Sequence, residues 1–242
     1  MKRKQYINLD LLDYLRKYGY SYNTEDSSIF FYALTKMKRY RNFLELGTGW
    51  GCTAFLVAAA MKENGIGKCI TYDNGQDYEN VRYPSFINQM INEFGLSEHI
   101  DFRNQNIVLD NITGQSFDCI FSDFDRSVAF IDKFIGWSLF NVNDHSSIFI
   151  DGLCDYYEGY YYTKLLVDML NRNTLPKSMI DSMTGDVHLA DKFVREHSFS
   201  LTTIRKCDKD KSRLVNNKDR TQNGMCWIKI EPNNIRFEIL GD

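Results

Sequence analysis

Hydrophobic residues follow two different spacings along this chain, one typical of buried strands and one typical of amphipathic helices. The strand-like runs are short, and the run at 117–123 is nearly continuously apolar, as in a parallel sheet that is covered on both faces. Helical spacing returns between successive runs, which predicts right-handed β-α-β crossovers. The expected strands cover residues 42–46, 69–73, 100–104, 117–123 and 147–151, and the expected helices cover 8–18, 25–38, 55–61, 84–95, 127–140, 155–170 and 186–196.

The last part of the chain departs from this alternation. Residues 198–206 and 225–231 have the pattern of two antiparallel strands, and a charged segment, 208–223, joins them. The expected fold class is therefore α/β: a Rossmann-like, doubly wound, seven-stranded sheet that is mostly parallel and ends in a C-terminal antiparallel hairpin.

Composition limits the classes of protein that remain. The chain has 242 residues, of which 43% are hydrophobic and 25% charged, as in a soluble globular domain. Its net charge of −3 argues against a general nucleic-acid binder, and no apolar run is long enough for a membrane helix. The six cysteines form no CxxC pair, so we expect reduced thiols in a cytoplasmic protein.

The segment after the first expected strand is the most informative part of the chain. It reads Glu45-Leu46-Gly47-Thr48-Gly49-Trp50-Gly51-Cys52-Thr53, a strand that runs into a turn with three glycines before an apolar helix. Glycines let the backbone turn sharply and let a ligand lie against bare main chain. A helix that begins at such a turn presents free N–H groups to an anion. The pattern therefore predicts a site for a nucleotide cofactor.

Acidic residues occur at four expected strand ends, namely Glu45, Asp73, Asp123 and Asp151. Ligands of open α/β sheets bind at that edge of the sheet. Asp73, which closes the second strand, can accept hydrogen bonds from both hydroxyls of a ribose. The alternatives are that Asp73 lies in an exposed loop and that Asp123, with Asp125, caps the next helix.

These residues resemble the class I S-adenosylmethionine-dependent methyltransferases, in particular the catechol O-methyltransferase-like group, over roughly 24–152 and in the terminal hairpin. Residues 45–53 match the family motif Glu-Leu-Gly-x-x-x-Gly-x-Ser, with Thr53 in place of the serine. The resemblance implies that the three glycines face the methionine part of S-adenosylmethionine. It also implies that Thr53 lies near the methionine carboxylate and that Asp73 binds the ribose.

Asn106 stands where this family often has an acid that contacts the adenine amine, and its side-chain oxygen could accept the same hydrogen bond. Rossmann dehydrogenases share the strand–turn–helix unit but space their glycines G-x-G-x-x-G, whereas this turn is G-x-G-x-G. The expected cofactor-binding residues are Glu45, Gly47, Thr48, Gly49, Trp50, Gly51, Thr53, Asp73, Asn74, Asn106 and Asp123.

The resemblance raises the question of a metal. Metal-dependent members hold a divalent cation with an Asp after the fourth strand and an Asp-Asn pair after the fifth, and a Lys three residues past the first Asp acts as base. Asp123 and Asp151 match the two acids and are the expected Mg2+ ligands. Gly152 replaces the Asn, which removes a ligand, and Arg126 stands at the lysine position, where it cannot act as a base near neutral pH.

We expect methylation of an oxygen atom of a small molecule, with Asp123, Arg126 and His188 as catalytic residues. One alternative is metal-independent methylation of a peptide or carboxylate acceptor, because Arg126 binds anions well. Another is a catalytically silent module that binds S-adenosylmethionine. A shifted metal site that uses Asp125 or Asp155 is a further alternative.

The resemblance suggests one methyltransferase domain over 1–242, with N-terminal helices in 1–40, a cofactor-binding core in 41–152, an acceptor-side helical insertion in 153–197 and the terminal hairpin in 198–242. The tyrosines of 156–162 could line the acceptor site, pack the helix onto the sheet or form a dimer surface. The expected partners are a small-molecule or peptide acceptor and a second copy of the chain. No motif of a DNA methyltransferase follows the fourth strand, so nucleic acid is not expected as a partner.

Overall fold

A computed structural model describes residues 9–18, 25–75, 82–205 and 224–233 of the chain. Seven strands form one sheet: β1 Asn42–Leu46, β2 Lys68–Asp73, β3 Ile100–Asn104, β4 Phe117–Ser122, β5 Val142–Asp151, β6 His197–Arg205 and β7 Gly224–Pro232. Their order is β3-β2-β1-β4-β5-β7-β6, with β1 to β5 parallel and β7 antiparallel to both of its neighbours. This arrangement confirms the expected fold class.

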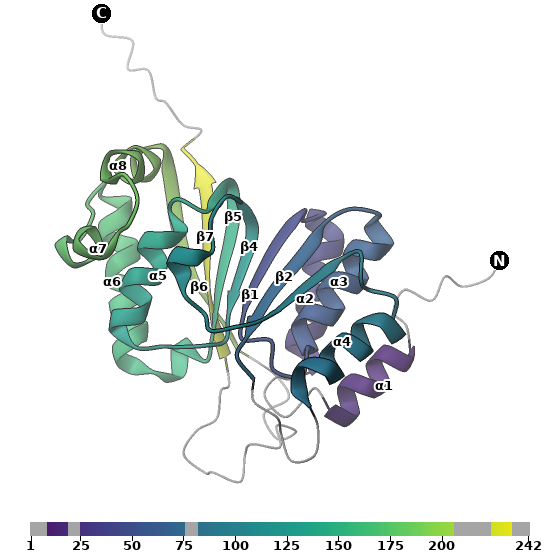
Figure 1. The fold of residues 1–242 in the computed structure, drawn as a ribbon. Helices are drawn as coiled ribbons and strands as arrows, with labels where there is room; N and C mark the ends of the chain where they lie inside the picture. Colours follow the sequence, from purple (N-terminus) through teal and green to yellow (C-terminus); the bar gives the residue numbers. More distant parts are fainter. Residues whose placement is uncertain (1–8, 19–24, 76–81, 206–223, 234–242) are drawn as a thin grey trace, which may run out of the picture.

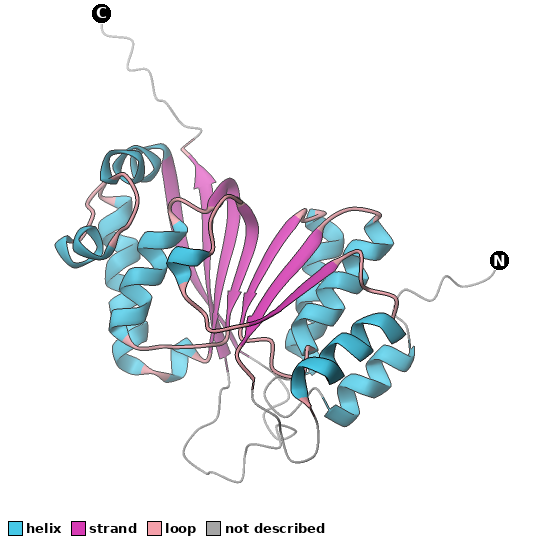
Figure 2. Cartoon of the chain, in the orientation of Figure 1, coloured by secondary structure: helices cyan, strands magenta, loops and turns pink. Residues whose placement is uncertain are grey.

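Helices cover both faces of the sheet (Figures 1 and 2). One face carries α1 Leu9–Tyr18, α2 Glu25–Lys38, α3 Cys52–Asn64 and α4 Tyr83–Glu93. The other carries α5 Val128–Ser138, α6 Tyr157–Asn171, α7 Lys177–Ser182 and α8 Val187–Glu196, together with the short 3-10 helices η2 Leu109–Asn111 and η3 Leu153–Asp155. Among the described residues, no helix combines the length and the apolar character that crossing a bilayer requires.

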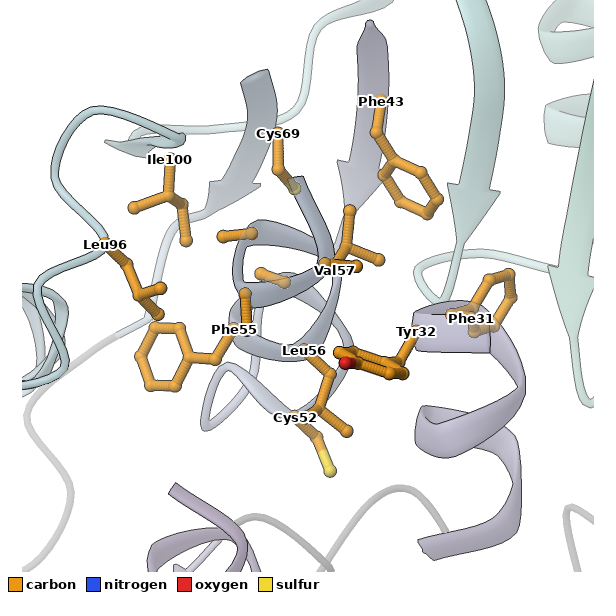
Figure 3. Close-up of a cluster of buried hydrophobic side chains, with 14 of the residues drawn as sticks. Phe31, Tyr32, Phe43, Cys52, Phe55, Leu56, Val57, Cys69, Leu96 and Ile100 are labelled. Carbon is orange, nitrogen blue, oxygen red and sulfur yellow. The ribbon is translucent and has the colours of Figure 1, made fainter. Parts of the chain in front are cut away.

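The helix that follows the glycine turn is buried more completely than an ordinary surface helix. Every residue of α3 from Cys52 to Met61 is buried, because α2 packs along this helix and Tyr14 of α1 packs against Phe55. Phe31 of α2 and Phe43 of β1 are fully buried in the same cluster (Figure 3). Gly65 ends α3 in a left-handed conformation, and its N–H donates to the carbonyl of Lys62. The N-terminus of α3 is thereby fixed at the carboxyl edge of the sheet.

Two details of the fold differ from the expectation. β5 begins at Val142, five residues earlier than predicted, so that His145 lies inside the strand and not before it. The polar residues at the start of β5 are exposed, so this end of the strand lacks the apolar run that is typical of a buried strand. α7 was not predicted, because it has only six residues and a single buried side chain, Met179. The charged segment 208–223 lies outside the described residues.

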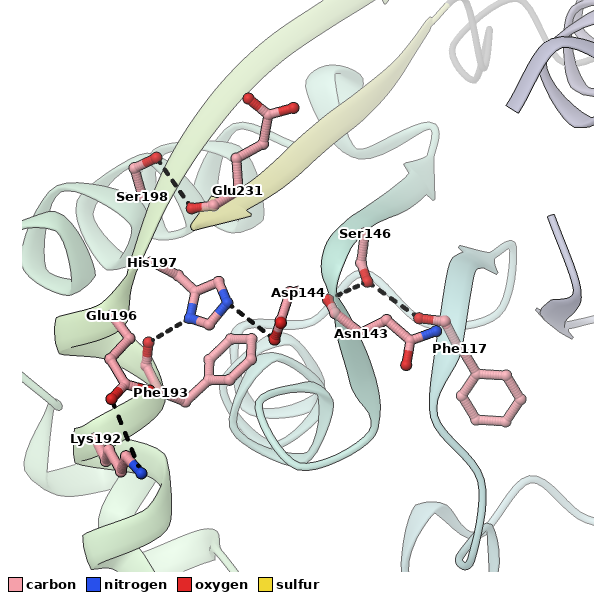
Figure 4. Close-up of polar contacts among 10 residues, drawn as sticks. All are labelled: Phe117, Asn143, Asp144, Ser146, Lys192, Phe193, Glu196, His197, Ser198 and Glu231. Carbon is pink, nitrogen blue, oxygen red and sulfur yellow. Dashed lines mark hydrogen bonds and ion pairs between the residues drawn. The ribbon is translucent and has the colours of Figure 1, made fainter. Parts of the chain in front are cut away.

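The amino edge of the sheet is closed by His197, the last turn of α8 and the start of β5 (Figure 4). Nδ1 of His197 donates to the carbonyl oxygen of Phe193 at 2.8 Å, and the two rings stack with centroids 3.9 Å apart. Nε2 lies 3.3 Å from Oδ1 of Asp144. His197 is therefore a structural residue at a helix end, on the edge opposite to the strand ends that carry the acidic residues.

Candidate functional site

The glycine turn joins β1 to α3 at the carboxyl edge of the sheet. Gly47, Gly49 and Gly51 have φ angles of 101°, 50° and 80°, a region that residues with a Cβ rarely adopt. A Cβ on Gly47 would lie 2.5 Å from the carbonyl oxygen of Asp123, and one on Gly51 would lie 2.6 Å from the ring of Phe55. The turn therefore requires glycine at these positions, because the end of β4 and the first turn of α3 approach it closely.

Glu45 lies beneath this turn and is only 1% exposed. Its Oε2 accepts the hydroxyl of Thr71 at 2.5 Å, and the hydroxyl of Thr48 lies 2.6 Å from that of Thr71. Burial raises the pKa of Glu45 well above its usual range; the Thr71 bond opposes this, and the charges of Asp123 and Asp73 add to it. Glu45 and Thr48 thus support the turn from inside the protein.

Asp73 ends β2 beside the turn, and its Oδ2 accepts the N–H of Gly49 at 2.8 Å. Tyr83 of α4 donates its hydroxyl to the carbonyl oxygen of Gly49 at 2.5 Å. Burial, followed by the charges of Asp73 and Glu45, raises the pKa of the Tyr83 hydroxyl. Tyr83 is a site residue that sequence reasoning missed; its only signal was its place before Pro84, at the start of an expected helix.

The remaining expected cofactor residues lie along the same edge. Asn74 and Asn106 follow β2 and β3, and the Asn74 amide donates to Oδ1 of Asn106 at 2.9 Å. Thr53 is buried in the first turn of α3, and the ring of Trp50 packs edge-on against that of Tyr83, with centroids 6.0 Å apart. The structure therefore places the cofactor set in one continuous band across β3, β2, β1 and the end of β4.

A second cluster lies at the ends of β4 and β5 and consists of Asp123, Arg126 and Asp151. Nη2 of Arg126 lies 2.5 Å from Oδ1 of Asp123 and 4.0 Å from Oδ2 of Asp151, and its Nε donates to the Asp151 carbonyl oxygen at 2.6 Å. Asp151 is 1% exposed and Arg126 11%. The arginine therefore neutralises buried carboxylates at two adjacent strand ends.

A cleft of about 750 Å³ opens beside this cluster. The loop between β4 and α5 forms one wall, and η3 with the start of α6 forms the other. Tyr156 and Tyr157 line it, whereas the Tyr162 hydroxyl donates to Asp132 of α5 at 2.5 Å and so packs α6 onto its neighbour. The tyrosine cluster thus serves both as an aromatic wall and in helix packing. The lining residues are Phe124, Asp125, Arg126, Ser127, Val128, Asp155, Tyr156, Tyr157, Glu158 and Gly159.

The residues at the expected Mg2+ position do not fit a divalent cation. The guanidinium of Arg126 lies against Asp123 and Asp151, and Gly152 offers no side-chain ligand. Asp125, the alternative ligand, accepts both the N–H and the hydroxyl of Ser127, the N-cap of α5. Within the described part of the chain, no three His, Cys, Asp or Glu side chains are grouped to hold a metal ion.

His188, the expected catalytic base, does not line the cleft. It is exposed near the start of α8, where its backbone N–H donates to Asp186, the N-cap of that helix. α8 leads into β6 at the amino edge of the sheet. His188 therefore does not lie on the acceptor side, although it follows β5 in the sequence. The geometry gives no support to a catalytic role for His188.

Comparison with known proteins identifies the fold. No protein-family model and no curated protein matches the sequence. Among solved structures, the chain is similar to an O-methyltransferase from Bacillus cereus in complex with SAH, with a TM-score of 0.56 and 17% identity over 93% of this chain and 92% of that one.

Two further structures agree with this comparison. A methyltransferase from Geobacter sulfurreducens gives a TM-score of 0.54 and 13% identity over 91% of this chain and 87% of that one. The O-methyltransferase TomG from Streptomyces achromogenes, in complex with SAM, gives a TM-score of 0.50 and 13% identity over 86% of this chain and 81% of that one. The protein therefore has the Rossmann-like α/β fold of class I S-adenosylmethionine-dependent methyltransferases.

Proposed function

We propose that this protein is an enzyme that transfers a methyl group from S-adenosylmethionine to an oxygen atom of a small molecule. The observation that carries the proposal is the glycine turn with Asp73 beside it. The turn keeps three glycines in the left-handed region, and Asp73 holds a carboxylate against it at the end of the adjacent strand. The solved structures of the same fold that are bound to SAM or SAH support this assignment.

The residues at this edge fit the cofactor. The glycine turn offers bare main chain to the methionine part, and Asp73 has lone pairs left for ribose hydroxyls. Asn74 and Asn106, whose side chains are hydrogen-bonded to each other beside Asp73, are the residues that we assign to the adenine. When bound, S-adenosylmethionine supplies a methyl group on a sulfonium sulfur, which an acceptor lone pair takes while the carbon–sulfur electron pair stays on sulfur.

The cleft beside Arg126 is the acceptor site in this proposal. Its aromatic side chains, Phe124, Tyr156 and Tyr157, suit a flat apolar acceptor. Asp123, which pairs with Arg126 of the cleft wall, is the carboxylate assigned to take the proton of a hydroxyl group. The charge of Arg126 is already paired with Asp123, so the geometry does not favour a carboxylate acceptor over a neutral one.

We also propose a cytosolic location and a homodimer. The cysteines in the described part of the chain form no disulfide, which supports a reducing compartment. Tyr157, Tyr161 and Leu165 follow one another at intervals of four residues along α6 and are exposed, which supports a self-complementary contact between two copies.

Replacing Asp73 with asparagine is expected to weaken the binding of S-adenosylhomocysteine roughly 10- to 100-fold, because hydrogen bonds to a charged acceptor contribute about 1.5–3 kcal/mol. Asparagine keeps an oxygen that can accept the N–H of Gly49, so the turn should retain its shape. Calorimetric titration of the wild type and the variant measures the change.

Asp191→Asn is the matched control, since Asp191 is an acid on α8 that pairs with Arg195 away from the turn. It should bind S-adenosylhomocysteine as the wild type does. Lack of binding by the wild type, or equal binding by Asp73→Asn, would reject the cofactor site. The protein is then incubated with S-adenosylmethionine and a panel of phenols and alcohols. An enzyme would produce S-adenosylhomocysteine, whereas a silent binding module would not.

A further inference from the structure

Asp123, Arg126 and Asp151 form a charged centre at the ends of β4 and β5. Two carboxylates there surround a positive charge, as at a metal site, but the positive charge belongs to a side chain. We propose that the guanidinium of Arg126 is the resident cation of this centre, in the place where a divalent metal would otherwise bind, and that methyl transfer depends on this arginine and not on Mg2+. The part that concerns methyl transfer rests on the proposed function. The cation site itself rests on the geometry of Asp123, Arg126 and Asp151 alone.

The charges of the centre require a cation. Asp151 is 1% exposed and Asp123 18%, and buried carboxylates are costly unless a positive charge lies close to them. Arg126 meets this need from one planar group: Nη2 lies 2.5 Å from Asp123, and Nε donates to the Asp151 carbonyl oxygen at 2.6 Å. The carboxylate of Asp151 is 4.0 Å from the same Nη2.

The position of Arg126 is fixed from two sides. The Cζ atom lies 5.6 Å from the centroid of the Tyr156 ring, within the range of a cation–π contact. A Cβ on Gly159 would lie 2.6 Å from the Arg126 carbonyl oxygen, so α6 packs directly against the arginine backbone. Arg126 is therefore held between the strand ends and α6, and its guanidinium is a permanent part of the centre.

A divalent cation cannot share this position with the guanidinium. The two positive charges would repel each other, and Oδ1 of Asp123 and the backbone carbonyl oxygen of Asp151 already accept hydrogen bonds from Arg126. Gly152 adds no ligand. Arg126 compensates the negative charges of Asp123 and Asp151 beside the cleft, so that these carboxylates do not oppose the loss of a proton from an acceptor oxygen there. This is the electrostatic role that a metal ion would have there.

The experiment exchanges one cation for the other. In Arg126→Ala/Gly152→Asn, the guanidinium is removed and a carboxamide oxygen is added beside Asp151. Gly152 has φ 66° and ψ −1°, a conformation that asparagine tolerates better than other residues with a side chain. Electron paramagnetic resonance with Mn2+ as the probe measures binding in the wild type, the double variant and Asp151→Asn.

We expect no Mn2+ binding by the wild type, in which the guanidinium of Arg126 lies against Asp123 and near Asp151. The double variant should bind one Mn2+, and saturation at about 100 times the dissociation constant should raise its thermal midpoint by about 5–10 °C. Wild-type binding of Mn2+ that is lost in Asp151→Asn would overturn the proposal, as would a folded double variant that binds none.

Two measurements keep this test independent. Should the double variant not fold, as judged by circular dichroism, the wild type still decides, because Mn2+ binding by the wild type that is lost in Asp151→Asn contradicts a resident guanidinium. Titration with S-adenosylhomocysteine is made separately, with and without Mg2+. Absence of S-adenosylhomocysteine binding would reject the proposed function. The Mn2+ measurements alone test whether the guanidinium takes the place of a metal ion.

Discussion

Replacing Arg126 with methionine is expected to lower the free energy of unfolding at neutral pH by about 3–5 kcal/mol, the usual effect of removing one partner of a buried ion pair. Methionine keeps an unbranched apolar chain beside Tyr156, so the change removes the charge of the guanidinium together with its hydrogen bonds. Asp151, at 1% exposure, would keep its carboxylate in the protein interior without the neighbouring guanidinium. Urea denaturation followed by circular dichroism measures the difference.

A second substitution tests the assigned cause. Asp151→Asn removes the buried negative charge, so the double variant Arg126→Met/Asp151→Asn should recover a large part of the lost stability. Arg195→Met is the control, because Arg195 forms an exposed ion pair with Asp191 on α8, and its denaturation midpoint should stay at the wild-type value. An equally small effect of Arg126→Met would show that the centre does not depend on the guanidinium.

Glu45 is expected to make the protein less stable as the pH rises above the acidic range. Its folded-state pKa is raised, first by burial, so the folded state holds the proton more tightly than the unfolded chain does. The free energy of unfolding is then highest below the pKa of the unfolded chain. It falls by up to about 1.4 kcal/mol per pH unit as the pH rises from that value towards the folded-state pKa.

Glu45→Gln removes this titration, and its oxygen can still accept the hydroxyl of Thr71. The difference in unfolding free energy between Glu45→Gln and the wild type should therefore grow in favour of the variant as the pH increases. Glu93→Gln, at an exposed position in α4, serves as the control for a general effect of charge. A pH profile of Glu45→Gln that runs parallel to the wild-type profile would contradict the prediction.

The sheet could be predicted from the sequence because its strands carry a local signal. β1 and β3 begin and end at the predicted residues, and β4, a nearly continuous apolar run, differs by one residue. The elements that were missed or shortened lack such a signal. The amino end of β5 is polar, and α7 is shorter than two helical turns.

The cofactor edge was also visible in the sequence. A glycine turn is recognisable because glycine alone adopts the required backbone angles readily, and an acid at a strand end is brought to the same edge by parallel pairing. The direct bond between Gly49 and Asp73 follows from that pairing. Tyr83 could not be assigned in advance, because a tyrosine at a helix start has no pattern that distinguishes a site residue from a core residue.

The acceptor side was decided by tertiary structure. Arg126 seemed available to an anionic acceptor, but the folded chain brings it against Asp123 and against the Asp151 carbonyl, which is 25 residues further along the chain. His188 followed the strand that ends at the site, yet α8 leads it to the other edge of the sheet. Neither outcome is encoded in the local spacing of residue types.

The amino-acid sequence by itself therefore determined the parallel sheet, the glycine turn and the acids at the strand ends, because backbone preferences and hydrophobic spacing act over a few neighbouring residues. Only the tertiary structure decided which charges pair at the ends of β4 and β5, which tyrosines line the cleft and where α8 lies. These contacts join residues far apart in the chain, and at the ends of β4 and β5 they bring Arg126 towards Asp123 and Asp151, because a buried carboxylate is costly without a positive charge nearby.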